Sequence, residues 1–396
     1  MINLKKSFED CLSFASNKVC ILRLDLNLPK VDGNYTDYTR LEKVIPTIKS
    51  LVEENGKILI IAHAGRPKGI DNKDLSLKPL QNILEKKLNT NVYFCNDDIF
   101  DRKIERFIKK LKRREVGLLE NIRFYHQEEE NDFTFARRIA SFGDIYINDS
   151  FSASHRDHAS ITGIGRFLPC FPGKLFEEEV KNMSHIFSNL HQNTIAILGG
   201  SKISSKLGII ENLATKFNKI LVGGAMANTI LDGMGYEIGK SFNEQGFKKE
   251  VNKIMNTFKD KIIVPEDVIC IPSLDSLDGI SFDIKSVGKN DLIVDIGPKT
   301  RKRFFNEVTS SENILWNGPL GMFEKKPFDN GTNYVASAVK QKNKNKFFSV
   351  AGGGDTISAL KNAECFNFFS YVSTGGGAFL ELIEGKKLPG IEILNK

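Results

Sequence analysis

Basic side chains recur where short apolar segments end in the first half of the chain. Arg23 and His63 lie at such ends, and Arg123 follows another. The planar guanidinium group of arginine suits phosphate and carboxylate ligands. Because parallel strands present their carboxyl ends at one edge of a sheet, these groups are predicted to converge on a pocket for a small, highly charged anion. A lone arginine more often forms a surface ion pair, so the shared position of several is the evidence for a pocket.

The corresponding positions in the second half of the chain are rich in glycine. Glycine lets backbone N–H groups approach phosphate closely, and helix N-termini favour negative charge. Any one of these loops is also explained as a tight turn, but five together favour a nucleotide site. They are Gly199–Lys202, Gly223–Gly224, Asn317–Gly321, Gly352–Thr356 and Ser373–Gly377. Within them Asp355 is a candidate Mg²⁺ ligand, with a helix N-cap as the alternative.

Two further patterns carry less weight. The segment Gly235–Ser241 resembles a phosphate-binding loop, but its two glycines are one residue too close and it follows a helical pattern. His155 and His158 suggest a metal site, yet no helical spacing places them beside a carboxylate. Neither pattern is taken as a binding site.

Strand-like and helix-like segments alternate along the whole chain, and this pattern predicts parallel sheets with helices on both faces. We therefore expect an α/β protein with two doubly wound, Rossmann-like domains, joined by a long helix over Leu175–Leu190 and a hinge. Proline and glycine break the chain near Phe167–Gly173, where we expect the boundary. The predicted strands lie near Lys18–Leu24, Lys57–Ala62, Asn91–Phe94, Val116–Glu120, Asp144–Ile147, Thr194–Leu198, Lys219–Val222, Lys261–Val264, Leu292–Asp295, Ile314–Trp316, Phe347–Ala351 and Phe369–Val372.

Length and composition restrict the class of protein. With 396 residues, 41% of them hydrophobic, the chain is long enough for two cored domains and is not disordered. No apolar run is long enough to span a bilayer. The six scattered cysteines and the charged N-terminus predict neither disulfides nor secretion, so the cytoplasm is the expected compartment. The net charge of +7 is compatible with binding of nucleic acid, with attraction of small anions, or with lysines that are only solvated at the surface.

Nine motifs, taken in order, resemble the phosphoglycerate kinase family over nearly the whole chain. In the first half these are Arg23–Asn27, His63–Pro67, Leu118–Phe124 and Asn148–Arg156. In the second half they are Leu198–Lys206, Asp295–Thr300, Leu315–Glu324, Gly352–Thr356 and Ser373–Gly377. The chain departs from the usual family pattern at Ser205, where aspartate is common before the second lysine.

The resemblance implies a monomeric glycolytic enzyme that transfers a phosphoryl group between Mg²⁺-bound ATP or ADP and the carboxylate of 3-phosphoglycerate or 1,3-bisphosphoglycerate. Residues 1–170 would bind 3-phosphoglycerate, and 171–190 would form the connecting helix and hinge. Residues 191–384 would bind nucleotide, and 385–396 would return to the first domain. No nucleic-acid or membrane partner is implied.

The resemblance also implies roles for individual residues. The basic patch around 3-phosphoglycerate would comprise Arg23, Asp25, Asn27, Arg40, His63, Arg66, Arg123, His155 and Arg156. Nucleotide would contact Lys202, Lys206, Gly223, Gly224, Asn317, Glu324, Gly353, Gly354, Asp355 and Thr356, with Asp355 on the metal.

Catalysis of this reaction needs no general base, because a carboxylate is already ionised at neutral pH. The rate enhancement must come from aligning the two substrates for in-line transfer and from neutralising charge on the phosphoryl group. Both are expected after the domains close. The catalytic candidates are Arg40, Lys202 and backbone N–H groups near Gly354 and Gly376. Two competing interpretations are a catalytically inactive nucleotide binder and a nucleic-acid-binding protein. The presence of Arg40, Lys202 and Asp355 argues against an inactive nucleotide binder. The arginines occur singly at strand ends and not as a continuous basic face, which argues against a nucleic-acid-binding protein.

Overall fold

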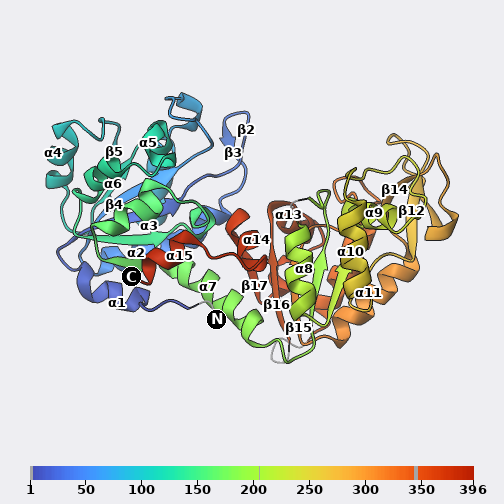
Figure 1. Ribbon diagram of the computed structural model, residues 1–396. Helices are drawn as coiled ribbons and strands as arrows, with labels where there is room; N and C mark the ends of the chain where they lie inside the picture. The colour runs from blue at the N-terminus through green and yellow to red at the C-terminus, as the bar shows by residue number, and fades with distance from the viewer. Residues whose placement is uncertain (1–2, 205, 343–346) are drawn as a thin grey trace. The chain divides into compact units, whose positions relative to one another are not determined.

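The computed structural model describes residues 3–204, 206–342 and 347–396, and they form two compact units (Figure 1). The N-terminal unit comprises the described residues up to Lys181 together with Lys387–Lys396. The C-terminal unit comprises the described residues of Asn182–Lys386. Ser205, the departure noted beside Lys206, lies outside the described residues.

The N-terminal unit is built on a six-stranded sheet of order β5-β6-β4-β1-β7-β8, in which every pair is parallel. Its strands are β1 (Val19–Asp25), β4 (Lys57–His63), β5 (Val92–Cys95), β6 (Val116–Leu119), β7 (Ile145–Asp149) and β8 (Cys170–Pro172). β1 and β4 are buried from their second residue to their last, as expected for central parallel strands covered on both faces. A small antiparallel ribbon pairs β2 (Lys30–Val31) with β3 (Asn34–Tyr35).

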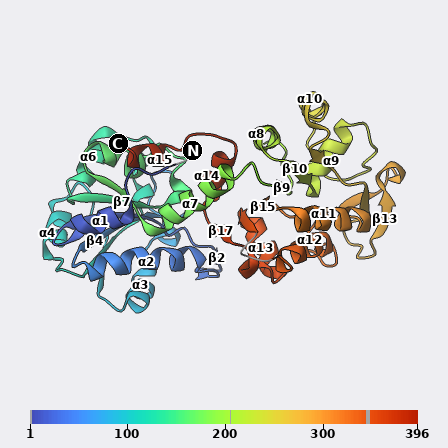
Figure 2. The same ribbon diagram turned by 90° about the horizontal axis from the view of Figure 1, so that it is seen from below.

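Helices cover both faces of this sheet (Figure 2). On one face lie α1 (Phe8–Ala15), α2 (Thr39–Glu53) and α3 (Leu80–Leu88), which pack against Cys20, Leu22 and Ile58 in one core. The remaining helices of the unit are α4 (Arg102–Lys110), α5 (His126–Glu129) and α6 (Phe133–Ala140), together with the C-terminal helix α15 (Pro389–Leu394). The backbone N–H of Gly390 donates to Ser154 at 2.8 Å, which fastens α15 to the segment after β7.

The C-terminal unit has a second six-stranded parallel sheet, of order β11-β10-β9-β15-β16-β17. Its strands are β9 (Thr194–Leu198), β10 (Lys219–Val222), β11 (Ile262–Ile263), β15 (Asn313–Asn317), β16 (Phe348–Gly352) and β17 (Tyr371–Ser373). The helices lie in two groups (Figure 2). The first is α8 (Leu207–Lys216), α9 (Gly224–Gly233) and α10 (Lys248–Phe258), and the second is α11 (Pro298–Ser310), α12 (Asn330–Lys340) and α13 (Gly354–Asn362). α14 (Gly377–Ile383) follows β17.

The predicted fold class, two α/β units with parallel sheets, is confirmed, and two segments need a closer description. Leu292–Asp295 falls in β14 (Leu292–Ile296), which belongs to a separate antiparallel sheet with β12 (Asp267–Ile271) and β13 (Ile280–Asp283). The apolar run was correctly identified as a strand, but its partners are distant in sequence. The proline-rich stretch expected as a break contains β8, whose Pro172 ends an edge strand, where a missing N–H is tolerated.

One long helix, α7 (Lys174–Ser188), contains the boundary between the two units. It begins beside β7, where the backbone N–H of Phe176 donates to the buried carboxylate of Asp149 at 3.0 Å. Lys174 N also donates to the Thr47 hydroxyl of α2 at 3.1 Å. The first turn of α7 is therefore tied to both a strand and a helix of the N-terminal unit. No helix among the described residues is long and apolar enough to cross a membrane.

Candidate functional site

The carboxyl end of β1 organises a cluster of predicted anion-binding residues in the N-terminal unit. The buried carboxylate of Asp25 accepts a hydrogen bond from Arg40 Nη1 at 3.0 Å and one from the backbone N–H of Asn27 at 3.0 Å. The hydroxyl of Ser152, from the segment after β7, donates to the same carboxylate. Arg40 Nη1 also donates to the carbonyl of Asn27 at 3.2 Å. Asp25 therefore fixes one side of the Arg40 guanidinium.

The loop after β4 is held between two of these predicted residues. The backbone N–H of Gly65 donates to Asn27 Oδ1 at 2.9 Å, and its carbonyl accepts from Arg123 Nη1 at 2.9 Å. Gly65 has φ +61, and a Cβ there would lie 2.6 Å from Leu75, so both the conformation and the space call for glycine. Asn27, Gly65 and Arg123 thus form one connected rim.

Arg123 has a donor that nothing in the described part of the chain satisfies. Its Nε is buried and has no hydrogen-bond acceptor, and the nearest carboxylate oxygen, on Glu129, lies 3.6 Å away. Burial and the neighbouring Arg23 lower the pKa of Arg123 to about 10, so it stays charged at neutral pH. An unsatisfied, charged, buried donor is costly in the absence of an anion. Glu129 supplies a nearby negative charge but no hydrogen bond, so an anionic ligand that accepted from Nε would remove this cost.

Arg23 occupies a different position from the one its motif suggested. Its side chain is fully buried, and each of its three nitrogens donates to a protein group. Nη2 lies 3.2 Å from His63 Nδ1, Nε lies 2.8 Å from Ser160 Oγ, and Nη1 donates to the carbonyl of Leu24. Arg23 therefore supports His63 from behind rather than offering a free guanidinium to a ligand.

The other predicted basic residues lie nearer the surface. Arg66 and Arg156 are exposed and His155 is partly buried. The pKa of His158 is lowered to about 4 mainly by burial, with Arg123, Arg23, Arg156 and His155 adding positive charge. Arg156 and His155 therefore act electrostatically on His158 in the buried cluster.

The sequence analysis missed several members of the cluster: Ser152, Ser160, Glu128 and His158. His158 was considered only as a metal ligand. Among the described residues no group of three or more histidine, cysteine or acidic side chains is placed to hold a metal ion. Ser152, Ser160 and Glu128 gave no sequence signal, because isolated serines and glutamates at no fixed spacing are uninformative.

Glycine-rich turns at the carboxyl ends of β9, β10 and β15 are joined to one another in the C-terminal unit. Backbone N–H groups of Gly199, Gly200 and Gly224 donate to carbonyls of Asn317, Pro319 and Leu320, at 2.8, 2.9 and 2.8 Å. A Cβ at Gly199 would lie 2.0 Å from the Pro319 carbonyl oxygen. These turns approach one another so closely that a side chain at Gly199 is excluded.

We expect Gly199→Ala to destabilise the C-terminal unit by about 3 kcal/mol, because a backbone carbonyl would have to shift to admit the new methyl group. Gly354→Ala is the matched control, since its Cβ would meet nothing within 4 Å. Thermal and denaturant unfolding of both variants would measure this. Equal stability of the two variants would contradict the packing argument.

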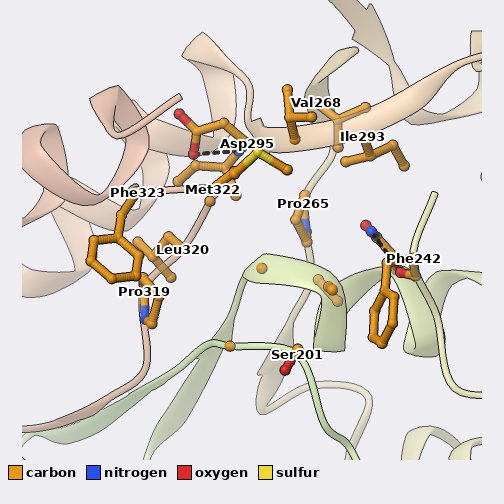
Figure 3. Close-up of a pocket in the computed structure, with 18 of the residues that line it drawn as sticks. Ser201, Phe242, Pro265, Val268, Ile293, Asp295, Pro319, Leu320, Met322 and Phe323 are labelled. Carbon is orange, nitrogen blue, oxygen red and sulfur yellow. Dashed lines mark hydrogen bonds between the residues drawn. The ribbon is translucent and has the colours of Figure 1, made fainter. Parts of the chain in front are cut away.

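A cavity of about 480 Å³ opens beside these turns (Figure 3). Figure 3 shows Pro319, Leu320 and Phe323 along one side and Val268 and Ile293 along another, with Ser201 across from them. Three predicted nucleotide-binding residues line it: Gly224, Glu324 and Asp355. A cavity with an apolar interior and polar groups at its edge suits a ligand in which a flat aromatic ring is attached to a charged group.

The remaining predicted nucleotide residues surround the β15 and β16 turns. Asn317 Nδ2 donates to the Gly352 carbonyl at 2.7 Å, and the Gly318 N–H donates to Thr356 Oγ1 at 2.7 Å. Gly353 has φ +105 and precedes α13 as its N-cap. Asn317 and Thr356 therefore brace the loops. Gly223 contacts Leu320 closely: a Cβ there would lie 2.5 Å away.

Two lysines follow the β9 turn. Lys206 Nζ donates to the Gly199 carbonyl at 2.6 Å. Burial lowers the pKa of Lys206 to about 8, although the negative charge of Asp355 opposes this shift. Lys202 is exposed, and its charge contributes to lowering the pKa of Glu244. Lys202 does not line the cavity.

Two of the predicted catalytic positions, Gly354 and Gly376, are open, since a Cβ at either would meet nothing within 4 Å. Asp355 is exposed in the first turn of α13, and the helix cap is Gly353, so the N-cap alternative for Asp355 is wrong. The accessible carboxylate of Asp355, beside open backbone, fits Mg²⁺, which takes one or two carboxylates and completes its shell with substrate oxygens and water.

Comparison with known proteins places these features in a family. A family model described as "Phosphoglycerate kinase" matches residues 10–386. Phosphoglycerate kinase of Rhizobium meliloti (strain 1021) is 40% identical over 396 residues, covering 99% of each chain. That of Orientia tsutsugamushi (strain Ikeda) is 44% identical over 385 residues, covering 96% of this chain and 94% of its own.

Solved structures agree. The structure of phosphoglycerate kinase from Coxiella burnetii superposes with a TM-score of 0.87 at 36% identity, and covers 96% of both chains. The enzyme from Pyrococcus horikoshii OT3 gives a TM-score of 0.83 at 28% identity with the same coverage. With a matching family model, close relatives over the full length and shared tertiary structure, this chain belongs to the phosphoglycerate kinase family.

Proposed function

We propose that the chain catalyses the reaction of its family, reversible transfer of a phosphoryl group between ATP and the carboxylate of 3-phosphoglycerate in glycolysis. One observation supports this proposal most directly. The guanidinium of Arg123 is charged and buried, and its Nε–H has no hydrogen-bond acceptor among the described residues. Such a group is stabilised by an anion. Its neighbours Asn27, Asp25 and Arg40 supply both donors and acceptors, as a hydroxyl-bearing acid requires.

The proposed 3-phosphoglycerate site draws on the cluster at the end of β1. Arg40, His63 and Arg123 would bind the anionic groups, while Asp25 and Asn27 would accept from the hydroxyl. Arg66, His155 and Arg156 would add charge at the rim, and Arg23 would act from behind His63. This division follows from burial, since Arg23 is fully enclosed whereas Arg66 and Arg156 are exposed.

The proposed nucleotide site uses the glycine turns of the C-terminal unit. The base would enter the apolar cavity past Gly224 and Glu324, and the phosphates would extend toward Lys202, Lys206 and the N-terminus of α13. Asp355 would hold Mg²⁺. The metal, when bound, supplies positive charge to the phosphate oxygens.

Transfer itself would need no proton acceptor in the protein. The side chains of Arg40 and Lys202 would neutralise charge on the phosphoryl group as it moves, with N–H groups at Gly354 and Gly376 as further donors. A Cβ at either glycine would meet nothing within 4 Å, and this open space beside the backbone supports the proposed role.

Direct in-line transfer requires the two bound substrates to come together, so we propose hinge-bending closure around the boundary in α7. Closure would also exclude water that would otherwise hydrolyse ATP. Small-angle scattering is expected to show a smaller radius of gyration with both substrates bound than with either alone. An unchanged radius would contradict closure.

The proposed working form is a monomer in the cytoplasm. Its expected partners are the two substrate pairs and Mg²⁺, without nucleic acid or membrane. Size-exclusion chromatography with light scattering would test the monomer, for which the sequence mass is 44.4 kDa.

A coupled assay tests the activity directly. The purified chain should consume ATP when 3-phosphoglycerate and Mg²⁺ are both present, and should consume little when any one is omitted. Chelation of Mg²⁺ with EDTA should abolish turnover, and added Mg²⁺ should restore it. Binding of ATP without dependence on 3-phosphoglycerate would instead indicate an inactive nucleotide binder.

Lys206 gives the nucleotide affinity a pH dependence. In the free protein its ammonium is charged below its pKa of about 8 and neutral above it. Attraction for the triphosphate is therefore present at pH 7 and falls as the pH rises toward 9, so the Kd for ATP should increase over that interval. Lys206→Arg keeps its charge across the range and should flatten the profile. Isothermal titration with the two proteins measures this, and parallel profiles would refute it.

A further inference from the structure

The buried Arg23 guanidinium constrains the protonation of His63. Arg23 Nη2 lies 3.2 Å from His63 Nδ1. A guanidinium nitrogen can only donate, so Nδ1 must be the acceptor and carries no proton. Burial, followed by the charges of Arg23, Arg123 and Arg40, holds the pKa of His63 well below its usual value. The ring is therefore neutral, and its single proton lies on Nε2.

Among the residues that the structure describes, no hydrogen-bond acceptor is found for the Nε2 proton of His63. The carboxylate oxygen recorded nearest to it, Asp25 Oδ1, is 4.0 Å away, beyond hydrogen-bond reach. Asp25 is instead occupied with Arg40, Ser152 and the backbone of Asn27. His63 Nε2 is thus a donor kept available within the cluster that we propose binds 3-phosphoglycerate.

Behind Arg23 lies a chain of hydrogen bonds with one consistent direction. Arg23 Nε donates to Ser160 Oγ at 2.8 Å, and the Ser160 hydroxyl donates to Glu128 Oε1 at 2.6 Å. The Ser160 backbone N–H donates to the other carboxylate oxygen, Oε2, at 2.8 Å. Both oxygens of Glu128 therefore accept from Ser160, which fixes the hydroxyl proton away from Arg23. That leaves an oxygen lone pair of Ser160 to receive the Arg23 N–H.

The charge balance of the buried groups agrees with this direction. Burial raises the pKa of Glu128, while Arg23 and the two hydrogen bonds from Ser160 oppose the rise. His158 Nδ1 lies 3.8 Å from Glu128 Oε1 and, with a pKa of about 4, adds no charge at neutral pH. Glu128 is fully buried and faces the same cluster as Arg23. It is the acidic group that can compensate the enclosed guanidinium.

We propose that Glu128 and Ser160 are positioning residues of the substrate site, which act through Arg23 to hold His63 as the tautomer that carries its proton on Nε2. This N–H then donates to an anionic oxygen of 3-phosphoglycerate. The inference deepens the proposed function and rests on it for the identity of the ligand. Neither Glu128 nor Ser160 touches the substrate in this scheme.

Nitrogen-15 NMR of histidine-labelled protein at pH 7.5 tests the tautomer without any ligand. His63→Gln assigns the resonances among the six histidines. In the unmodified protein, His63 Nδ1 should have the shift of an unprotonated nitrogen and Nε2 that of a protonated one. In Ser160→Ala and Glu128→Gln, both nitrogens should move toward averaged shifts. A proton on Nδ1 in the unmodified protein, or unchanged shifts in both variants, would overturn the proposal.

Steady-state kinetics test the consequence for substrate. Ser160→Ala and Glu128→Gln should raise KM for 3-phosphoglycerate about tenfold, since a donor to a charged group is weakened. The KM for ATP should stay within about twofold, which general destabilisation would not produce. Glu130→Gln, an exposed neighbour, is the matched control and should behave as the unmodified protein. An unchanged KM for 3-phosphoglycerate in both variants would refute the proposal.

The two lines of evidence also separate this inference from the proposed function. If the unmodified protein consumes no ATP with 3-phosphoglycerate, the proposed function fails, although the NMR measurement still decides the tautomer. Should Glu128→Gln fail to fold by circular dichroism, Ser160→Ala and the unmodified protein give both readouts.

Discussion

Replacing Arg40 with alanine is expected to lower kcat about 100-fold while the protein stays folded. Arg40 Nη1 makes both of the residue's hydrogen bonds, to Asp25 and to the Asn27 carbonyl. Its Nε and Nη2 have no partner among the described residues, so half of the guanidinium fork is available to the transferring phosphoryl group. Loss of one donor aimed at developing charge costs about 3 kcal/mol in barrier.

The measurement is kcat in the coupled assay, with circular dichroism to check folding. The side chain of Arg40 is about one-third exposed, so its removal leaves room for water rather than a sealed void. Arg113→Ala, an exposed arginine of the same unit, should retain full activity. Turnover of Arg40→Ala within threefold of the unmodified protein would show that Arg40 does not act on the reacting group.

Replacing Lys202 with alanine is expected to have an effect of similar size, about 100-fold on kcat. Lys202 is exposed and follows directly after the turn Gly199–Ser201, whose backbone is fixed by the β15 loop. An exposed lysine that follows a fixed turn can supply positive charge to a phosphate. Lys206, by contrast, is partly buried and hydrogen-bonded to Gly199, and should affect ATP affinity more than turnover.

Single-turnover measurements with saturating ATP separate the two lysines. Lys202→Ala should slow the chemical step, and Lys202→Arg should recover part of the rate because charge is retained. Lys240→Ala, exposed in the same unit, is the control. A variant that binds ATP poorly but turns over normally at saturation would contradict a catalytic role for Lys202.

Several features of the fold could be predicted because their causes are local. Strands β1, β4 and β9 are buried along nearly their whole length, and that burial is visible in the sequence as consecutive apolar residues. Their parallel arrangement followed from the helical segments between them. Strand β14 was also found as an apolar run, but its antiparallel pairing with β12 was not, because an apolar run specifies neither its partner nor its direction.

Within the site, residue type was predictable and orientation was not. The sequence placed Arg23 and Arg40 near the end of the same strand, and both were read as groups that face the substrate. In the structure Arg23 points inward to His63 and Ser160, while Arg40 stays at the surface with free donors. Arg23 lies within β1 and Arg40 lies in the first turn of α2, so the packing around each residue, and not its type, decides which guanidinium stays accessible.

The sequence by itself determined the two-unit α/β architecture, the strand ends at which charged and glycine-rich segments occur, and the chemical class of ligand for each. These properties depend on apolar runs and residue types, which are present in the chain before it folds. Only the tertiary structure decided that Glu128 and Ser160 support Arg23, and that Phe242, Val268 and Met322 line one cavity. Those contacts join residues separated by tens to more than a hundred positions, and packing against distant neighbours, rather than local pattern, selects them.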